Sequence, residues 1–154
     1  MQGTTLGGRY NIIRHLGGGG FAQTYLAEDR QLPGKHCCVV KQLKPQTTDP
    51  ATLQIARRLF DTEAQVLYQL GSHDRIPQLF AYFEENQEFY LIQEFIEGQD
   101  LSQEFAQKLQ NHQGQLGLSE EEVIELLQEI LEVLDFVHQQ NVIHRDVNPR
   151  NIIR

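Results

Sequence analysis

The spacing of apolar residues changes character twice along the chain. Five short runs, rich in β-branched and aromatic residues, predict strands at residues 9–16, 23–29, 36–43, 78–84 and 88–95. Turn signals separate these runs: four consecutive glycines from Gly17, the pair Pro33-Gly34, and Glu85-Asn86-Gln87. The first part of the chain is therefore expected to form a five-stranded antiparallel sheet.

Helical periodicity appears in three places. Residues 51–70 form the first predicted helix, inserted after the third strand and ended by Gly71. Its predicted buried face comprises Ala56, Leu59, Phe60, Leu67 and Leu70. After Gly98, two further helices are predicted at 101–112 and 119–140. The last begins with a Ser119–Glu122 capping box, and its apolar stripe comprises Val123, Leu127, Ile130, Leu134 and Val137. The pattern predicts an α+β protein of two parts.

Composition narrows the classes of function. With 154 residues, 40% of them hydrophobic, the chain can bury a core of its own. The net charge of −8 argues against non-specific binding of nucleic acid, which needs a basic face. No apolar run approaches the roughly 20 residues of a membrane helix, and the N-terminus lacks the features of a signal peptide. Cys37 and Cys38 point to opposite faces of a predicted strand, which favours reduced thiols and a cytoplasmic location.

The glycine-rich turn is the first candidate binding element. Residues 17–22 read Gly-Gly-Gly-Gly-Phe-Ala, close to G-x-G-x-x-G with alanine in the last position. Glycines let backbone N–H groups approach phosphates because no Cβ stands in the way. The segment is also compatible with a plain hairpin turn. It leads into a strand and lacks Gly-Lys-Ser/Thr, which excludes both a dinucleotide-binding turn and a P-loop.

Lys41 and Glu63 are the next candidates. Val39 and Lys41 point to the same face of an apolar strand, so the ammonium needs water, a carboxylate or an anion. Glu63 lies on the apolar face of the first predicted helix, where an unpaired carboxylate is costly. We therefore expect the two to pair, which would fix the ammonium where it can contact phosphates. The alternatives are a lysine that reaches past the sheet edge into water and a boundary glutamate that faces solvent.

The segment His144-Arg145-Asp146-Val147-Asn148-Pro149-Arg150-Asn151 carries the strongest chemical signal. Asp146 is placed to accept the proton of an attacking hydroxyl group. Asn151, five residues later, offers a hard oxygen ligand for Mg²⁺. His144 is a poor metal ligand because no second ligand has suitable spacing.

Taken in order, these motifs resemble the bacterial serine/threonine protein kinases with the eukaryotic-like fold, from about Arg9 to Arg154. The resemblance implies a kinase N-lobe at 9–97 and a partial, helical C-lobe at 98–154. It implies the substrates ATP and a protein with a serine or threonine hydroxyl, with Mg²⁺ as cofactor. Lys41 would bind the α- and β-phosphates and pair with Glu63, Asp146 would be the catalytic base, and Asn151 would hold magnesium.

The same resemblance assigns the remaining nucleotide contacts. The phosphates would be covered by Gly17, Gly19 and the N–H groups of Gly20 and Phe21. The adenine would be enclosed by Leu16, Thr24, Val39 and, as its floor, Ile153, with Gln93 as gatekeeper. The hinge hydrogen bonds would come from the Glu94 carbonyl and the Ile96 amide, and Asp100 would contact the ribose. Arg145 would normally meet a phosphate on the activation loop.

Several positions depart from the family pattern. Ala22 replaces the third glycine and Thr24 the usual valine. Asn148 stands where serine/threonine kinases usually have a lysine that neutralises the γ-phosphate. Tyrosine kinases resemble this chain in having an arginine immediately before the asparagine, so Arg150 is expected to supply the missing charge.

The chain stops three residues after Asn151. The metal-binding Asp-Phe-Gly segment, the activation loop and most of the C-lobe are not in the sequence, so the 154 residues alone are expected to be catalytically incomplete. The alternative hypothesis is a remnant without catalysis that docks to a partner through an exposed apolar face of the helix at 119–140. A Rossmann-type oxidoreductase is excluded because alternating βαβ units are missing.

Overall fold

The computed structural model describes residues 1–111 and 118–154 of the chain. Within these residues the chain divides into two compact units, Met1–Phe95 and Ile96–Arg154. This division falls two residues before the boundary predicted between the two lobes. Residue 112, the last of the predicted helix 101–112, lies outside the described residues.

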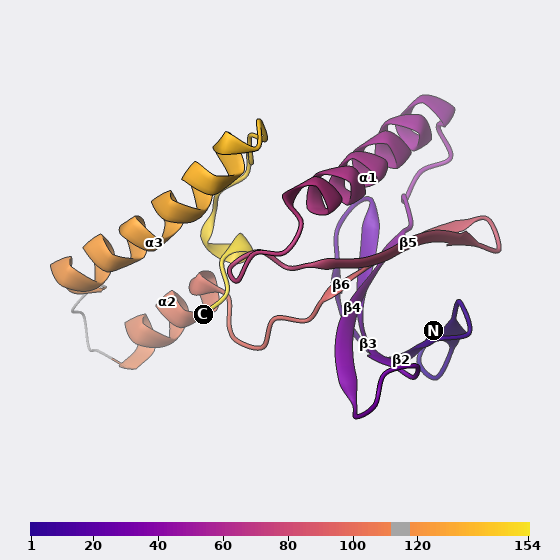
Figure 1. The fold of residues 1–154 in the computed structure, drawn as a ribbon, viewed down its shortest axis with the longest axis horizontal. Helices are drawn as coiled ribbons and strands as arrows, with labels where there is room; N and C mark the ends of the chain where they lie inside the picture. Colours follow the sequence, from indigo (N-terminus) through magenta and orange to yellow (C-terminus); the bar gives the residue numbers. More distant parts are fainter. Residues whose placement is uncertain (112–117) are drawn as a thin grey trace. The chain divides into compact units, whose positions relative to one another are not determined.

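The first unit contains a six-stranded sheet in the order β1-β2-β3-β4-β6-β5 (Figure 1). Every pairing in it is antiparallel. The strands are β1 (Thr5–Leu6), β2 (Tyr10–Gly18), β3 (Ala22–Asp29), β4 (His36–Leu43), β5 (Leu79–Glu85) and β6 (Glu88–Glu94). The prediction of five strands was wrong by one, because β1 has only two residues and is too short to show an alternating pattern.

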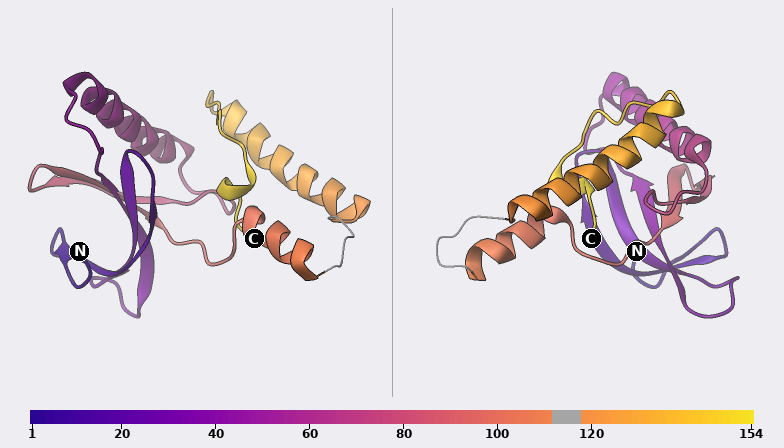
Figure 2. Two further views of the ribbon diagram at one scale, coloured as in Figure 1. Left: turned by 180° about the vertical axis from the view of Figure 1, so that it is seen from behind. Right: turned by 60° about the vertical axis from the view of Figure 1, so that its left-hand side comes forward.

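The helix α1 (Pro50–Leu70) packs across one face of this sheet (Figures 1 and 2). Its start is defined by Asp49, whose carboxylate accepts a hydrogen bond from the Thr52 amide at 2.9 Å. Phe60 and Ala64 of α1 pack against Leu91 of β6. Leu59, predicted on the buried face, is 57% exposed. It lies one residue, or about 100°, from Phe60 around the helix, which is enough to turn it to solvent.

The opposite face of the sheet forms the larger core. It is built from Leu6, Tyr10, Ile12, Tyr25, Ala27, Cys38, Val40, Tyr90 and Ile92. Because side chains alternate along a strand, Cys38 and Val40 enter this core while Val39 and Lys41 point to the face that carries α1. Cys37 is exposed and Cys38 is buried, which agrees with their predicted placement on opposite faces of the strand, and both are free thiols. Burial raises the pKa of the Cys38 thiol to about 12, which makes it unreactive.

The predicted turn between β5 and β6 is confirmed. Asn86 and Gln87 both have positive φ, at 53° and 65°, and Glu85 pairs with Glu88 across the turn. Two central residues with positive φ are the signature of a type I′ hairpin, whose twist matches that of the strands. Asparagine tolerates this conformation well, whereas Gln87 carries some strain.

The second unit contains α2 (Leu101–Asn111), α3 (Glu120–Gln139) and the short 3₁₀ helix η1 (Pro149–Asn151). The predicted capping box is confirmed: Glu122 N donates to Ser119 Oγ at 3.2 Å and Ser119 N donates to Glu122 Oε2 at 2.7 Å. Lys108 of α2 donates to Glu122 Oε1 at 3.1 Å, which joins the two helices. No helix among the described residues is long and apolar enough to cross a membrane.

The predicted apolar stripe of α3 is divided in the structure. Val137 is buried and Ile130 and Leu134 are half-buried, whereas Val123 and Leu127 are exposed. Leu126, which was not predicted, is buried instead. The exposed apolar face of α3 consists of Val123, Ile124, Leu127 and Leu131, in which Leu127 lies three or four residues from each of the others. We refer to these four residues as the exposed α3 face.

A short two-stranded ladder holds the C-terminal residues against the start of the second unit. Gln99 and Arg154 exchange backbone hydrogen bonds of 2.9 Å in both directions. The adjacent Gly98 has φ 154°, and a Cβ built there would lie 2.3 Å from the carbonyl oxygen of Arg154. Gly98 is therefore required both by its backbone conformation and by the close approach of the chain.

Candidate functional site

The glycine-rich turn joins β2 to β3 in the first unit. Gly19 N donates to Ala22 O at 2.9 Å and closes the turn. A Cβ built on Gly17, Gly19 or Gly20 would meet no atom within 4 Å, so the backbone borders open space. Because the Gly19 amide is used within the turn, the amides of Gly20 and Phe21 are the better candidates for binding an anion.

The tip of this turn is tied to the segment that follows β4. Lys44 N donates to Phe21 O at 2.8 Å, and Gln46 N donates to Gly20 O at 3.3 Å. These bonds use carbonyl groups of the turn. In a trans peptide unit the C=O and N–H point in opposite directions, so the bond accepted by Gly20 O leaves the Phe21 N–H directed away from Gln46. The turn is thus anchored through its carbonyl groups, and the Phe21 N–H is not used in this anchoring.

Gly18, the additional glycine of this turn, has a different role. A Cβ built there would lie 2.5 Å from the side chain of Gln23, which crosses the hairpin. Gln23 Oε1 is 2.8 Å from His15 Nε2. The absence of a side chain at Gly18 therefore makes room for a His15–Gln23 hydrogen bond across the turn. This contact was not predicted, although the spacing of residues 18 and 23 across a tight turn indicates it.

The predicted pairing of Lys41 with Glu63 is confirmed. The Lys41 ammonium on β4 donates a hydrogen bond to Glu63 Oε1 on α1. The Lys41 side chain is 27% exposed and the Glu63 side chain 40% exposed, so the pair remains open to solvent. This excludes both alternatives, a lysine directed into water and an unpaired boundary glutamate. A cation held in this way can contact an anion without a further conformational search.

Thr24 and Val39 share the face of the sheet that carries Lys41. Thr24 lies directly opposite Lys41 in the β3–β4 register, and Val39 lies two residues before it. Val39 also faces Gln93 on β6, the predicted gatekeeper. Leu16, at the other end of the predicted adenine site, is exposed on β2. The sheet thus brings the predicted contacts Thr24, Val39 and Gln93 together around Lys41.

Glu94 and Asp100 have structural contacts of their own. The amide of Glu94, whose carbonyl is the predicted hinge acceptor, donates to Gln78 O at 2.8 Å. Asp100 caps α2: its carboxylate accepts hydrogen bonds from the Ser102 hydroxyl and, at 3.0 Å, from the Gln103 amide. The Ser102 bond is the main reason that the pKa of Asp100 is lowered. The capping role was not predicted, although Asp followed three residues later by Gln indicates it.

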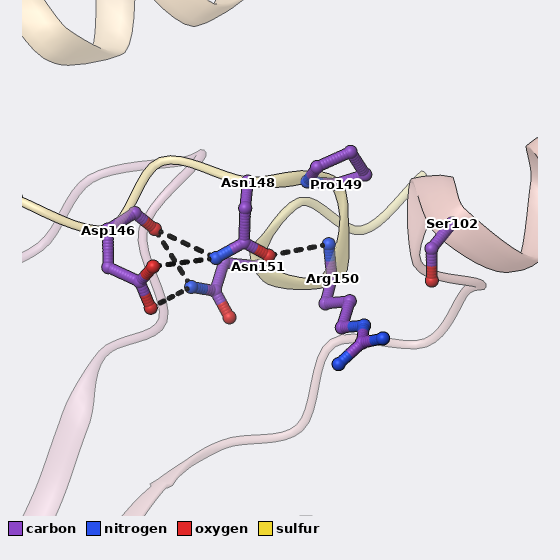
Figure 3. A pocket seen from close by; sticks show the side chains of 6 residues that line it. All are labelled: Ser102, Asp146, Asn148, Pro149, Arg150 and Asn151. Carbon is purple, nitrogen blue, oxygen red and sulfur yellow. Dashed lines mark hydrogen bonds between the residues drawn. The ribbon is translucent and has the colours of Figure 1, made fainter.

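Asp146 is held by two carboxamides (Figure 3). Asn148 Nδ2 lies 2.9 Å from Asp146 Oδ1, and Asn151 Nδ2 lies 3.0 Å from Asp146 Oδ2. The same two amide groups donate to the main-chain carbonyl of Asp146, at 3.2 and 2.9 Å. The carboxylate therefore receives one hydrogen bond at each oxygen, and both oxygens keep lone pairs free to accept a proton.

The loop around Asp146 borders an open hollow of about 580 Å³ within the second unit. Its lining consists of Ser102, Asp146, Asn148, Pro149, Arg150 and Asn151 (Figure 3). The guanidinium of Arg150 also contributes to the lowered pKa of Asp100. The hollow thus combines a carboxylate acceptor with a cation close by. Arg145, which precedes Asp146, is exposed with φ 63°.

The residues present fit a magnesium ion brought in by a phosphate ligand. Both hydrogen bonds of the Asn151 carboxamide to Asp146 come from its nitrogen, so its oxygen points away from Asp146 (Figure 3). A carboxamide oxygen is a ligand that Mg²⁺ accepts, and Mg²⁺ commonly binds through a few protein oxygens together with substrate phosphates. Within residues 1–111 and 118–154, no three His, Cys, Asp or Glu side chains cluster to hold a metal alone.

A curled antiparallel sheet with one helix, followed by helices and a loop with a carboxylate held by amides, is the arrangement of the protein kinase fold. Residues 10–154 match the protein kinase domain family, and the chain belongs to that family. It is 46% identical over 149 residues to the serine/threonine-protein kinase B of Synechocystis sp., a match that covers 97% of this chain. It is 45% identical over 149 residues to the serine/threonine-protein kinase PknA of Nostoc sp., covering 96% of this chain.

Solved structures agree with this assignment. The kinase domain of Mycobacterium tuberculosis PknI superposes with a TM-score of 0.75 at 27% identity, over 99% of this chain and 56% of that one. The chain covers 25% of each of the two cyanobacterial relatives. It therefore spans about a quarter of the length of the curated relatives it matches and a little over half of a solved kinase domain.

Proposed function

We propose that this chain supplies the nucleotide-binding part and the catalytic loop of an ATP-dependent serine/threonine protein kinase. The observation that carries the proposal is the held carboxylate of Asp146, which lies on an exposed loop beside Asn151 and Arg150. Both partners of this carboxylate lie within five residues of it along the chain, so its hydrogen bonds hold only the local segment that leads into η1. The Lys41–Glu63 pair supports the proposal independently, from the first unit.

In the proposed reaction, Asp146 accepts the proton of a substrate serine or threonine hydroxyl. The hydroxyl oxygen forms a bond to the γ-phosphorus of ATP, the bond from that phosphorus to the β–γ bridging oxygen breaks, and ADP leaves. Lys41 binds the α- and β-phosphates, and the amides of Gly20 and Phe21 cover them. Asn151 would hold Mg²⁺, which when bound offsets the negative charge of the phosphates.

The proposed adenosine contacts follow the family. Leu16, Thr24 and Val39 would contact the adenine from the first unit, and Ile153 from the second. The Glu94 carbonyl and Ile96 amide would bind its polar edge, and Asp100 the ribose. Of these groups, Thr24 is unusual because its hydroxyl would face an apolar ring, and Asp100 must bind ribose with a carboxylate that already caps α2.

Arg150 is proposed to supply the charge that a lysine at position 148 would have given. It lines the same hollow as Asp146. Phosphoryl-transfer catalysis depends mostly on positioning and on stabilising charge, so removal of a cation slows turnover more than it weakens binding. Arg150→Ala should lower kcat by roughly a hundredfold, and Arg150→Lys should recover part of it. Unchanged turnover in Arg150→Ala would exclude this role.

The decisive experiment is transfer of the labelled γ-phosphate of ATP to a protein substrate by the protein as its gene encodes it. Asp146→Asn should abolish transfer and leave binding of a non-hydrolysable ATP analogue intact. We expect residues 1–154 alone to bind the analogue without transferring phosphate, because they contain only one of the proposed metal ligands. Absence of ATP binding in both forms would refute the kinase proposal.

A cytoplasmic location is part of the proposal and rests on the two free thiols.

The exposed α3 face favours a second candidate function. Its four apolar side chains are each at least 40% exposed, which is unusual for a helix that buries another side. A remnant without catalysis would use this face to dock to a partner protein. Adding the remainder of a kinase domain as a separate polypeptide distinguishes the two functions: restored phosphate transfer supports the kinase, and association without transfer supports the docking role.

A further inference from the structure

Asn148 makes hydrogen bonds in two directions with one side chain (Figure 3). Its Nδ2 donates to Asp146, and its Oδ1 accepts from the amide of Arg150 at 3.0 Å. We propose that Asn148 is a positioning residue that fixes the Asp146 carboxylate and the start of η1 in a single arrangement. This inference rests on the proposed function, because it takes Asp146 as the proton acceptor.

The orientation of the Asn148 carboxamide is determined by its neighbours. A backbone N–H can only donate, so the atom of Asn148 that faces Arg150 N must be the oxygen. The nitrogen is then directed to Asp146, whose carboxylate and carbonyl oxygens can only accept. Exchanging the two ends of the amide would place like groups against each other on both sides. Only one orientation of the Asn148 carboxamide therefore satisfies both hydrogen-bond partners.

Few residue types can make this double contact. Lysine has three donors and no acceptor, so it could reach Asp146 but could not cap η1. Serine could cap η1, but its single hydroxyl cannot also reach the Asp146 carboxylate. Aspartate would cap η1 and repel Asp146. Asparagine has an acceptor and a donor at opposite ends of a short planar group, which matches the two partners on this loop.

The second carboxamide makes the arrangement symmetrical about Asp146. Asn148 binds Oδ1 and Asn151 binds Oδ2, and each also binds the carbonyl oxygen of the same residue. Rotation of the carboxylate would break bonds at both oxygens together. A base that is already oriented loses less freedom when the substrate hydroxyl arrives, which is how positioning lowers an activation barrier. Asn148 thus acts on the base itself and leaves charge stabilisation to Arg150.

A set of substitutions separates the cap from the contact with Asp146. Asn148→Ser keeps an oxygen for the Arg150 amide and removes the donor to Asp146, whereas Asn148→Ala removes both. Asn148→Lys introduces the family residue. If the proposal holds, kcat falls roughly ten- to a hundredfold in Asn148→Ser, as expected for loss of a hydrogen bond to a charged group, while KM for ATP changes little. The kcat of Asn148→Ala falls at least as far, and the kcat of Asn148→Lys stays below that of the unaltered protein.

The contrary results are equally specific. A kcat in Asn148→Ser equal to that of the unaltered protein would show that Asn148 is only a cap. A kcat in Asn148→Lys at or above that value would show that a cation is what the position needs. Gln107→Ala, on the exposed side of α2, is the control for effects of a substitution that are unrelated to the Asp146 loop. These rates are measured in the protein as its gene encodes it.

A second measurement does not depend on activity. In protein labelled with ¹⁵N-asparagine, the Asn148 side-chain amide signals are assigned by their loss in Asn148→Ser. Asp146→Ala should shift these signals if the carboxylate is their acceptor, and unshifted signals would refute the contact. If the unaltered protein binds ATP and transfers no phosphate to any substrate, the proposed function fails, and the shift alone then decides whether Asn148 positions Asp146.

Discussion

The ammonium of Lys41 on β4 donates a hydrogen bond to the carboxylate of Glu63 on α1. Both residues belong to the first unit, and both side chains are partly exposed. An ion pair of this kind contributes little to the free energy of unfolding, about 1 kcal/mol or less. The pair is therefore expected to matter mainly because it holds the Lys41 ammonium in one position.

Substitutions at this pair should separate activity from stability. Lys41→Met should lower kcat by roughly 10²–10³-fold, because it removes a cation from the phosphates. Glu63→Gln should have a smaller effect in the same direction, because Lys41 stays charged but is no longer fixed. Thermal unfolding of both variants should lie close to that of the unaltered protein. Glu84→Gln, on the exposed side of β5, is the control. A Glu63→Gln variant that unfolds at a clearly lower temperature than the unaltered protein would contradict this account.

The contact between Arg9 and Asp29 should govern stability in acid. Arg9 Nε donates to both oxygens of the buried carboxylate, at 2.8 and 3.0 Å, and Nη2 donates to one of them at 2.6 Å. The guanidinium lowers the pKa of Asp29 below its ordinary value of 3.8. A lowered carboxyl pKa stabilises the fold fully above pH 3.8, and this contribution is lost as the pH falls through the folded-state pKa.

Asp29→Asn tests this pH dependence. At neutral pH the variant should lose roughly 1–3 kcal/mol of unfolding free energy, as expected for hydrogen bonds between charged groups. Below the folded-state pKa the difference should vanish, because Asp29 is then neutral in the unaltered protein as well. Urea unfolding at a series of pH values measures both quantities. Asp74→Asn, whose side chain is 83% exposed, should show no such trend.

Two glycine substitutions should differ sharply in cost. Gly98→Ala places a Cβ 2.3 Å from the Arg154 carbonyl oxygen at φ 154°, and should cost about 1–3 kcal/mol. Gly18→Ala meets only the flexible end of Gln23, which can move at the expense of its bond to His15. Gly18→Ala is therefore the matched control, with a loss below about 1 kcal/mol. Equal losses on thermal unfolding would contradict the steric explanation for Gly98.

Neighbouring leucines on α3 provide another matched pair. Leu126 is 9% exposed and Leu127 is 51% exposed. Leu126→Ala should destabilise the second unit by about 2–5 kcal/mol, because it leaves a cavity. Leu127→Ala should change stability by about 0.5 kcal/mol or less. The measurement is thermal unfolding of residues 1–154.

Charge on the exposed α3 face should alter association and leave the fold intact. Leu127→Glu combined with Leu131→Glu should reduce the concentration-dependent self-association of residues 1–154, because it interrupts a contiguous apolar patch. Sedimentation velocity at several concentrations measures this. Identical sedimentation of both forms would show that the face has no tendency to associate.

Most of the sheet could be predicted from the sequence because its strands alternate clearly and its turns carry strong signals. The third strand was predicted with the bounds of β4, and the Asn86-Gln87 turn was identified. β1 was missed because two residues cannot show a period. Leu59 was misplaced because helical periodicity gives the centre of an apolar face more reliably than its edge.

The candidate site was predictable where residue type alone decides the partner. A lysine and a glutamate on facing apolar surfaces have few other groups with which to pair. The Lys41–Glu63 ion pair was therefore predicted correctly. Asn148 shows the limit of this reasoning. From the sequence it is only a position without the usual lysine, because the two directions of its hydrogen bonds depend on the backbone path from Asp146 to η1. Local backbone geometry of this kind is not encoded in a pattern of residue types.

The hydrogen bonds from Lys44 and Gln46 to the tip of the glycine-rich turn have a mechanical consequence. These residues belong to the segment that runs on to Asp49, the cap of α1. The turn and the helix that carries Glu63 are therefore connected by a short segment, the six residues from Lys44 to Asp49. A ligand that moves the turn is therefore expected to move the first turn of α1 as well. Phosphate binding and the position of Glu63 would then be mechanically coupled.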